Sequence, residues 1–232
     1  MTAPAAHPPN TKRAGSARLL TVDLAGPEGR LEAVVNEGAA DAPFAALVCH
    51  PHPKAGGTLH NKVVYGAMKA LNAPEWGLQW PVLRFNFRGT GRSDGTHDGK
   101  AEAEDVLAAR DWLENQYGLP VVLVGFSFGA AMALRSVKLD GHGVRAVAAL
   151  GLPTHADGHN YRYSFLKEIR VPKLFLSGAD DEYSSPAELE TIGAQAAEPW
   201  RLILLPGADH FFSGHLEPMQ GALSGWLKEQ VA

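Results

Sequence analysis

The sequence predicts an α/β fold, a mostly parallel, twisted sheet of eight strands flanked by helices on both faces. Two observations carry this prediction. Short runs of consecutive apolar residues recur along the chain, as expected of strands that are covered on both faces. Segments with a helical spacing of apolar residues separate these runs, so strands and helices alternate. No repeat or long linker interrupts 17–232, which favours a single domain behind a flexible tail at 1–16.

The elements are expected in the following order. The runs 17–24 and 30–35 flank the turn Gly26-Pro27-Glu28-Gly29 and predict an antiparallel hairpin. Six more strands are predicted at Phe44–Cys49, Pro81–Phe87, Val121–Gly125, Val144–Leu150, Lys173–Ser177 and Arg201–Leu205. Helices are predicted at Asn61–Leu71, Lys100–Tyr117, Ser127–Val137 and Leu216–Val231. Acidic residues gather in the first half of the second helix, where the helix dipole favours negative charge.

Composition excludes several classes of protein. The chain has 232 residues, of which 45% are apolar and 20% charged, as in a globular protein rather than a disordered one. Its formal net charge of −4 argues against nucleic-acid binding. One cysteine cannot form an intramolecular disulfide, and no apolar run approaches the roughly 18 residues of a transmembrane helix. We therefore expect a cytoplasmic protein with neither a nucleic-acid nor a membrane partner.

The stretch Gly125-Phe-Ser127-Phe-Gly129 is the most informative part of the sequence. It lies where a predicted strand passes directly into a predicted helix. A serine in such a sharp turn projects its hydroxyl above the sheet edge, and the two glycines allow neighbouring backbone to approach closely. The following helix N-terminus supplies N–H groups where an oxyanion would form. Ser127 is therefore predicted to be a nucleophile.

A serine nucleophile needs a base and an orienting acid from the ends of later strands. Asp180 and Asp181 follow the strand that ends near Ser177, and His210 follows the last strand. Ser127, then Asp181 or Asp180, then His210 is the chain order Ser…Asp…His of one group of catalytic triads. His210 would take the serine proton, and the aspartate would hold the imidazole in the correct tautomer.

Other residues near these positions offer alternatives. His215 would be the base if the histidine loop folded differently. Asp209, directly before His210, fits a loop cap better than a triad acid. Asp157 is a minor candidate for the acid, in a Gly-rich stretch that gives it no structural support.

From about Leu19 onward the sequence resembles the α/β-hydrolase family, and most closely its small members without a cap. The resemblance rests on His50-Pro-His52-Pro53, on Arg88-Gly89-Thr-Gly91-Arg-Ser93 and on the motif around Ser127. Many members of the family carry the acid three residues after the glycine that ends the seventh strand. Counting from Gly178, the resemblance implies Asp181 as the acid.

An oxyanion hole needs two donors. The N–H of Phe128, directly after the nucleophile, is the expected first donor. In the His50–Pro53 loop only His50 and His52 have a backbone N–H. The family resemblance implies His52 as the second donor.

The remaining histidines, arginines and cysteine are interpreted as structural. His50 and His52 have no third ligand at metal-like spacing, so no metal site is predicted. His155 and His159 are expected to be loop residues in solvent. The segment with Arg84, Arg88 and Arg92 lacks a phosphate-loop pattern and fits a turn with ion-paired arginines. Cys49 is expected to be a small buried apolar residue.

The substrate pocket is predicted to be open. Only twenty residues separate Gly151 from Pro172, where many α/β-hydrolases insert a helical lid, so a cap domain does not fit. The loops 52–59, 88–99 and 153–165 are expected to form the walls. The aromatic side chains predicted to line the pocket are Tyr161, Tyr163 and Phe165.

These inferences predict a serine hydrolase, and specifically a carboxylesterase that cleaves short-chain esters of small molecules through an acyl-enzyme. No cofactor is implied, because water completes the reaction. Two alternatives stay open. The same triad serves a peptidase or a thioesterase, and a hydrolase-like scaffold can bind a ligand without turnover.

Overall fold

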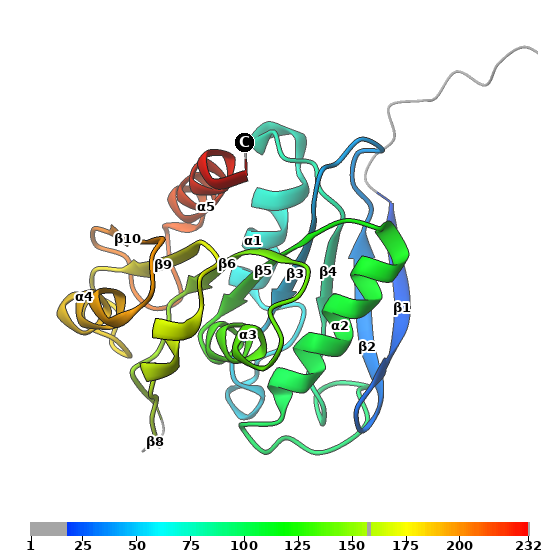
Figure 1. Ribbon diagram of the computed structural model, residues 1–232, viewed down its shortest axis with the longest axis horizontal. Helices are drawn as coiled ribbons and strands as arrows, with labels where there is room; N and C mark the ends of the chain where they lie inside the picture. Colours follow the sequence, from blue (N-terminus) through cyan, green and yellow to red (C-terminus); the bar gives the residue numbers. More distant parts are fainter. Residues whose placement is uncertain (1–17, 157–158, 232) are drawn as a thin grey trace, which may run out of the picture.

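The computed structural model describes residues 18–156 and 159–231, so the predicted tail at 1–16 and Asp157 lie outside the described residues. Its main sheet has eight strands in the order β1-β2-β4-β3-β5-β6-β9-β10 (Figure 1). The strands are β1 (Leu19–Gly26), β2 (Gly29–Asn36), β3 (Ala45–Cys49), β4 (Val82–Phe85), β5 (Val121–Phe126), β6 (Val144–Leu150), β9 (Lys173–Gly178) and β10 (Trp200–Leu205). The hairpin β1–β2 is antiparallel, as is the pair β2–β4, and all later pairs are parallel. The predicted α/β sheet is confirmed.

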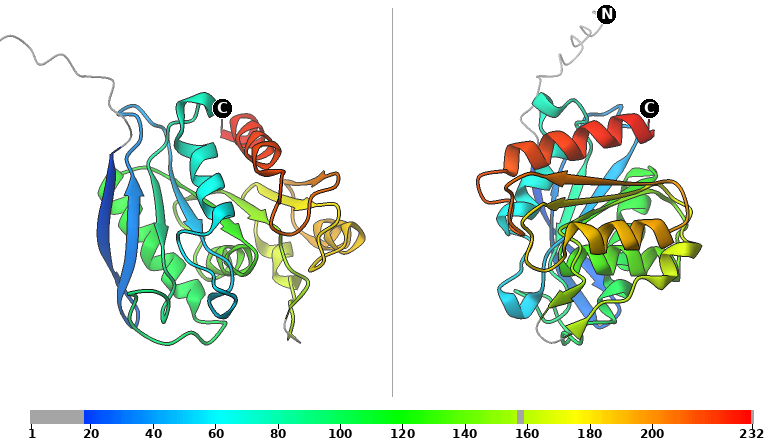
Figure 2. Two further views of the ribbon diagram at one scale, coloured as in Figure 1. Left: turned by 180° about the vertical axis from the view of Figure 1, so that it is seen from behind. Right: turned by 90° about the vertical axis from the view of Figure 1, so that its left-hand side faces the viewer.

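Helices cover both faces of this sheet. They are α1 (Lys62–Asn72), α2 (Glu102–Tyr117), α3 (Phe128–Leu139), α4 (Pro186–Gln195) and α5 (Leu216–Val231). Side chains of α1 and α5 share one buried cluster, and those of α2, α3 and α4 belong to the other. Strand side chains divide between the two by alternation: Val122 and Val124 join the α1–α5 cluster, and Leu123 joins the other. In the right-hand view of Figure 2, β9 and β10 run between α5 and α4.

The start of α2 differs from the sequence expectation. The helix begins at Glu102 rather than at residue 100, and two of its first acidic residues are buried instead of only facing the helix dipole. The Glu102 carboxylate accepts the N–H groups of Asp98 (3.0 Å) and Gly99 (3.1 Å), which holds the preceding loop. Asp105 accepts both the backbone N–H and the guanidinium of Arg88. The first turn of α2 therefore anchors the loop after β4.

Helix α4 was not predicted from the sequence. Only Leu189 and Gly193 of its ten residues are buried, so it has no apolar stripe to reveal it. Its signal is local: the Ser185 hydroxyl accepts the N–H of Glu188, and the Glu188 carboxylate accepts the N–H of Ser185, a capping box with proline at the first helical position.

Several short elements complete the chain. They are the 3₁₀ turns η1 (Pro53–Ala55), η2 (Pro74–Trp76) and η3 (Ser164–Glu168) and the two-residue strands β7 (His155–Ala156) and β8 (His159–Asn160). The elements described for 18–156 and 159–231 include no lid domain over the carboxyl edge of the sheet. Within the described residues, no helix is long and apolar enough to cross a membrane.

Candidate active site

Ser127 occupies a sharp turn between β5 and α3. Its φ of 55° and ψ of −119° lie in a region that L-residues rarely adopt. The Ser127 N–H donates to the Leu150 carbonyl of β6 at 2.9 Å, and its own carbonyl accepts the N–H of Ala130 at the start of α3. The surrounding sheet and helix thus hold the strained backbone, as is common at functional sites.

The glycines on either side of Ser127 are required by close packing. A Cβ on Gly125 would lie 2.3 Å from the carbonyl oxygen of Gly129, which belongs to the next helix. A Cβ on Gly129 would lie 2.5 Å from the backbone oxygens of both Cys49 and His50. All these neighbours are backbone atoms, so neither site can adapt by moving a side chain.

Gly129→Ala should therefore lower the free energy of unfolding by about 3 kcal/mol or more, since overpacking against backbone forces the start of α3 away from the end of β3. Gly225→Ala in α5 is the matched control, because a Cβ there meets no atom within 4 Å. It should leave stability unchanged or raise it by up to about 1 kcal/mol. Urea unfolding of both variants measures the difference, and equal stabilities would contradict the packing argument.

The structure brings Ser127, His210 and Asp181 together from three loops. His210 Nε2 lies 3.0 Å from Ser127 Oγ, and His210 Nδ1 lies 2.9 Å from Asp181 Oδ2. His210 is 3% exposed and Asp181 is 7% exposed, so solvent has little access to the hydrogen bond between them. With Nδ1–H donated to the carboxylate, Nε2 is left to accept the serine proton.

Asp181 is held by two further hydrogen bonds that sequence reasoning missed. The Ser177 hydroxyl donates to Asp181 Oδ2 at 2.8 Å, and the Tyr183 N–H donates to Oδ1 at 2.8 Å. By contrast, Asp180 is exposed, and its N–H donates to the Ala208 carbonyl at 3.0 Å. The structure therefore places Asp181, not Asp180, against the histidine.

The alternative residues of the histidine loop have other partners. The Asp209 carboxylate accepts the N–H of Ser213 at 2.8 Å, and this hydrogen bond lowers the pKa of Asp209. Asp209 is therefore a loop cap. The His215 ring bonds the Ser213 carbonyl at 2.9 Å. Neither side chain takes part in the contacts around Ser127 Oγ.

The two proposed oxyanion donors lie on facing segments. Phe128 is the first residue of α3, so its N–H has no acceptor inside the helix. His52 is half-buried on the loop after β3, and its ring contacts the Phe128 ring with a centroid distance of 5.0 Å. His50, the other candidate in this loop, is fully buried. The geometry therefore fits His52 rather than His50 beside Phe128.

His50 instead ties two loops of the site together. Its Nδ1 lies 2.6 Å from the Pro51 carbonyl, and its Nε2 accepts the N–H of Phe87 at 3.0 Å. Burial lowers the pKa of His50 from its ordinary 6.5 to about 4, and the nearby His52 and His97 add to the effect. A neutral His50 thus joins the loop after β3 to the loop after β4.

The burial of His50 makes the free energy of unfolding depend on pH. Between pH 6.5 and about 4 the unfolded chain protonates His50 while the native protein does not. The free energy of unfolding should therefore fall as the pH is lowered through this range, by up to about 3 kcal/mol. Urea unfolding at pH 7, 5 and 4 measures this fall in the free energy of unfolding. His50→Gln should show a shallower decline than wild type, and parallel declines would exclude His50 as the source.

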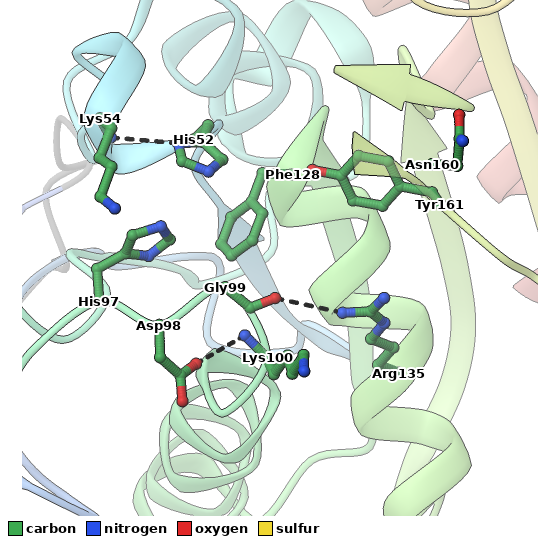
Figure 3. A pocket seen from close by; sticks show the side chains of 10 residues that line it. All are labelled: His52, Lys54, His97, Asp98, Gly99, Lys100, Phe128, Arg135, Asn160 and Tyr161. Atoms are coloured by element: carbon green, nitrogen blue, oxygen red, sulfur yellow. Dashed lines mark hydrogen bonds between the residues drawn. The ribbon is translucent and has the colours of Figure 1, made fainter. Parts of the chain in front are cut away.

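A cavity of about 330 Å³ opens beside His52 and Phe128. Figure 3 shows the side chains that line it, with Phe128 between His52 on one side and Tyr161 on the other. The three loops expected to form the pocket walls all contribute to it. Tyr161 lies where the sequence placed it, among the described residues of the lining.

Tyr163 and Phe165 lie elsewhere. Tyr163 is buried, and its hydroxyl donates to the Pro153 carbonyl at 2.7 Å. Phe165 packs, half-buried, against the core cluster that contains α3. These two side chains pack η3 and the residue before it against the core, and neither belongs to the described lining of the cavity.

The residues interpreted as structural occupy structural positions. Arg88 is buried and paired with Asp105 at 2.7 Å and Glu28 at 2.8 Å, and Arg92 pairs with Glu32 at 2.8 Å. Arg84 differs, because it donates to the Leu59 carbonyl and to Asn36 rather than to a carboxylate. Cys49 is buried, which raises the pKa of its thiol. Within 18–156 and 159–231, no three His, Cys, Asp or Glu side chains cluster to hold a metal.

Comparison with known proteins shows the family to which this chain belongs. The family described as "Alpha/beta hydrolase domain" matches residues 52–220. An uncharacterized protein from Rickettsia prowazekii is 34% identical over 210 residues, which are 87% of this chain and 86% of that protein.

Solved structures agree with this match. A serine hydrolase without a lid from Xanthomonas campestris has a TM-score of 0.78 and 28% identity, covering 95% of this chain and 99% of its own. A serine hydrolase homologue from Coxiella burnetii has a TM-score of 0.79 and 31% identity, covering 90% and 97%. The sheet order, the serine turn and these matches lead to one conclusion: the chain belongs to the α/β hydrolase superfamily, among its members without a cap.

Proposed function

We propose that this protein is a serine carboxylesterase that cleaves short-chain esters through an acyl-enzyme. The observation that carries the proposal is the continuous hydrogen-bond path from Ser127 Oγ through His210 to the Asp181 carboxylate. A ligand-binding scaffold has no need of this path, whereas nucleophilic catalysis does. The cavity of about 330 Å³ suits a short acyl group.

Acylation begins with attack by Ser127 Oγ on the ester carbonyl carbon. His210 Nε2 takes the serine proton, and the N–H groups of Phe128 and His52 stabilise the negative oxygen of the tetrahedral intermediate. When the intermediate collapses, the bond to the alcohol oxygen breaks and His210 returns the proton to it. The alcohol leaves, and the acyl group stays on Ser127.

Deacylation repeats these steps with water. His210 removes a proton from a water molecule that attacks the acyl carbon, and then protonates Ser127 Oγ as the acid leaves. One ester and one water thus become one acid and one alcohol, with the enzyme restored. Throughout, Asp181 keeps Nδ1 protonated and stabilises the imidazolium, supported by its bonds from Ser177 and Tyr183.

The test combines covalent labelling with turnover. The protein is incubated with a fluorophosphonate, and the added mass is located by peptide mass spectrometry beside a series of p-nitrophenyl esters from acetate to dodecanoate. We expect labelling at Ser127 and the highest kcat/KM with short acyl chains. Turnover of thioesters or peptides in preference to these esters would replace the proposal with a thioesterase or peptidase. Absence of both labelling and turnover would refute it.

A further inference from the structure

The cavity beside the oxyanion residues is rich in positive charge. Lys54 lies in the 3₁₀ turn η1, Lys100 precedes α2, and Arg135 lies on the second turn of α3. In Figure 3 these side chains surround Phe128 from three separate parts of the chain. Such a concentration is unexpected in a chain with a formal net charge of −4.

These three cations have no acidic partner. Among the described residues, none of them forms an ion pair, whereas Arg88, Arg110 and Arg201 all do. Arg135 is half-buried, and within the described part of the chain its guanidinium makes only a long hydrogen bond of 3.4 Å to the Gly99 carbonyl. Most of its donors are therefore available to a ligand.

Among the described residues that line the cavity, one acidic side chain, Asp98, stands against the three cations. Asp98, in the cavity wall, accepts the N–H groups of Lys100 (2.7 Å) and Ala101 (2.8 Å), and these bonds lower its pKa. Glu102 lies behind the wall and is fully buried, with its Oε1 2.5 Å from His97 Nδ1. The positive charge that faces the cavity is thus only partly offset.

The position of the cavity indicates which part of a bound ester, the acyl chain or the alcohol, would meet this positive charge. The leaving oxygen must face His210 Nε2, since it receives its proton there. The rings packed on His210 are those of Phe126, Tyr183 and Phe211, and none of them belongs to the described lining of the cavity. The cavity adjoins Phe128 and His52 instead. In the proposed ester complex it therefore lies on the side of the acyl chain, away from the alcohol that faces His210.

We propose that the protein prefers esters whose acyl chain ends in an anionic group, which Arg135 binds with help from Lys54 and Lys100. This inference rests on the proposed esterase function and names its substrate class. A guanidinium matches a carboxylate with two parallel hydrogen bonds, and the aromatic walls formed by Phe128 and Tyr161 accommodate the methylene chain.

The test compares three p-nitrophenyl esters of the same acyl length: hexanoate, the monoester of adipic acid, and the same adipate with its free carboxylate methylated. We expect kcat/KM for the adipate monoester to exceed that for hexanoate by about ten-fold or more, a typical effect of a charge-assisted hydrogen bond. Methylation should remove the advantage, and added salt should reduce it. An ester with a terminal phosphonate shows which anion is preferred.

Variants identify the residues responsible for the preference for an anionic acyl chain. Arg135→Gln should reduce the ratio of kcat/KM for adipate over hexanoate to about that of the methylated ester, mainly through KM, and Arg135→Lys should keep part of it. Lys138→Gln is the matched control on the same helix, because Lys138 is exposed and pairs with Glu168 outside the cavity. It should leave both rates unchanged. An unchanged ratio in Arg135→Gln would overturn the assignment.

A binding measurement separates this proposal from the esterase proposal. Ser127→Ala is titrated calorimetrically with monomethyl adipate and with dimethyl adipate. Binding of the anion in preference to the diester, lost in the double variant with Arg135→Gln, supports the anionic site even if no ester is turned over. Two results together overturn the anionic site and leave the esterase proposal standing. The wild-type protein turns over hexanoate without preferring the adipate monoester, and Ser127→Ala binds monomethyl adipate no more tightly than dimethyl adipate.

Discussion

Ser127→Ala should reduce ester turnover by about 10⁵–10⁶-fold, because the attacking oxygen is removed while the rest of the site is retained. The fold should survive, since alanine keeps the Cβ and the backbone bond from Ser127 N–H to the Leu150 carbonyl. Initial rates with p-nitrophenyl acetate measure the loss, and circular dichroism and urea unfolding check the structure.

The control for Ser127→Ala is a serine within the helix that follows it, α3. The Ser136 hydroxyl is buried and donates to the Ala133 carbonyl at 2.8 Å, three residues earlier in the same helix. Ser136→Ala should therefore keep nearly full activity. A folded Ser127→Ala variant that still turned over ester, or took up the fluorophosphonate, would remove Ser127 as the nucleophile.

Asp181→Asn should lower kcat by about 10⁴-fold, because an amide can donate to His210 Nδ1 and thereby favour the wrong tautomer. Asp180→Asn is the adjacent control. Its side chain is exposed, and its described contact to the loop is made by the backbone N–H, which asparagine retains. Steady-state kinetics of the two variants gives the comparison directly.

The ranking of these two variants decides which aspartate orients the histidine. A larger loss in Asp180→Asn would assign the role to its side chain and would contradict the 2.9 Å contact between Asp181 and His210. Ser177→Ala extends the test. It removes one hydrogen bond to Asp181, so a reduction of about ten-fold in kcat is expected, with a smaller effect on KM.

The sequence was sufficient for the sheet because its inner strands are apolar on both faces and helices lie between most of them. Val121–Gly125, for example, was predicted as a strand and forms most of β5. The contacts of Ser127, His210 and Asp181 could be predicted for a related reason. The carboxyl ends of parallel strands meet at one edge, so residues that follow separate strands become neighbours. Helix α4 was not predicted because its apolar residues form no clear amphipathic pattern, although Ser185 and Glu188 mark its start.

The cavity could not be predicted in this way. Lys54, Lys100 and Arg135 are far apart in sequence, and no spacing rule links a 3₁₀ turn, a loop and a helix. Only the folded chain brings them around Phe128. The aromatic residues show the converse. Tyr161, Tyr163 and Phe165 look alike in sequence and all pack in or against the same core cluster, yet of these three only Tyr161 also belongs to the described lining of the cavity.

The loops that carry the acid and the base are joined to each other as well as to the sheet. The Asp180 N–H bonds the Ala208 carbonyl, and a Cβ on Gly178 would lie only 2.0 Å from that same oxygen. The conformational entropy of aligning Asp181 with His210 is therefore lost once, when the chain folds, and not again in each catalytic cycle. As the protein is heated, catalytic competence and tertiary structure should consequently disappear in the same transition.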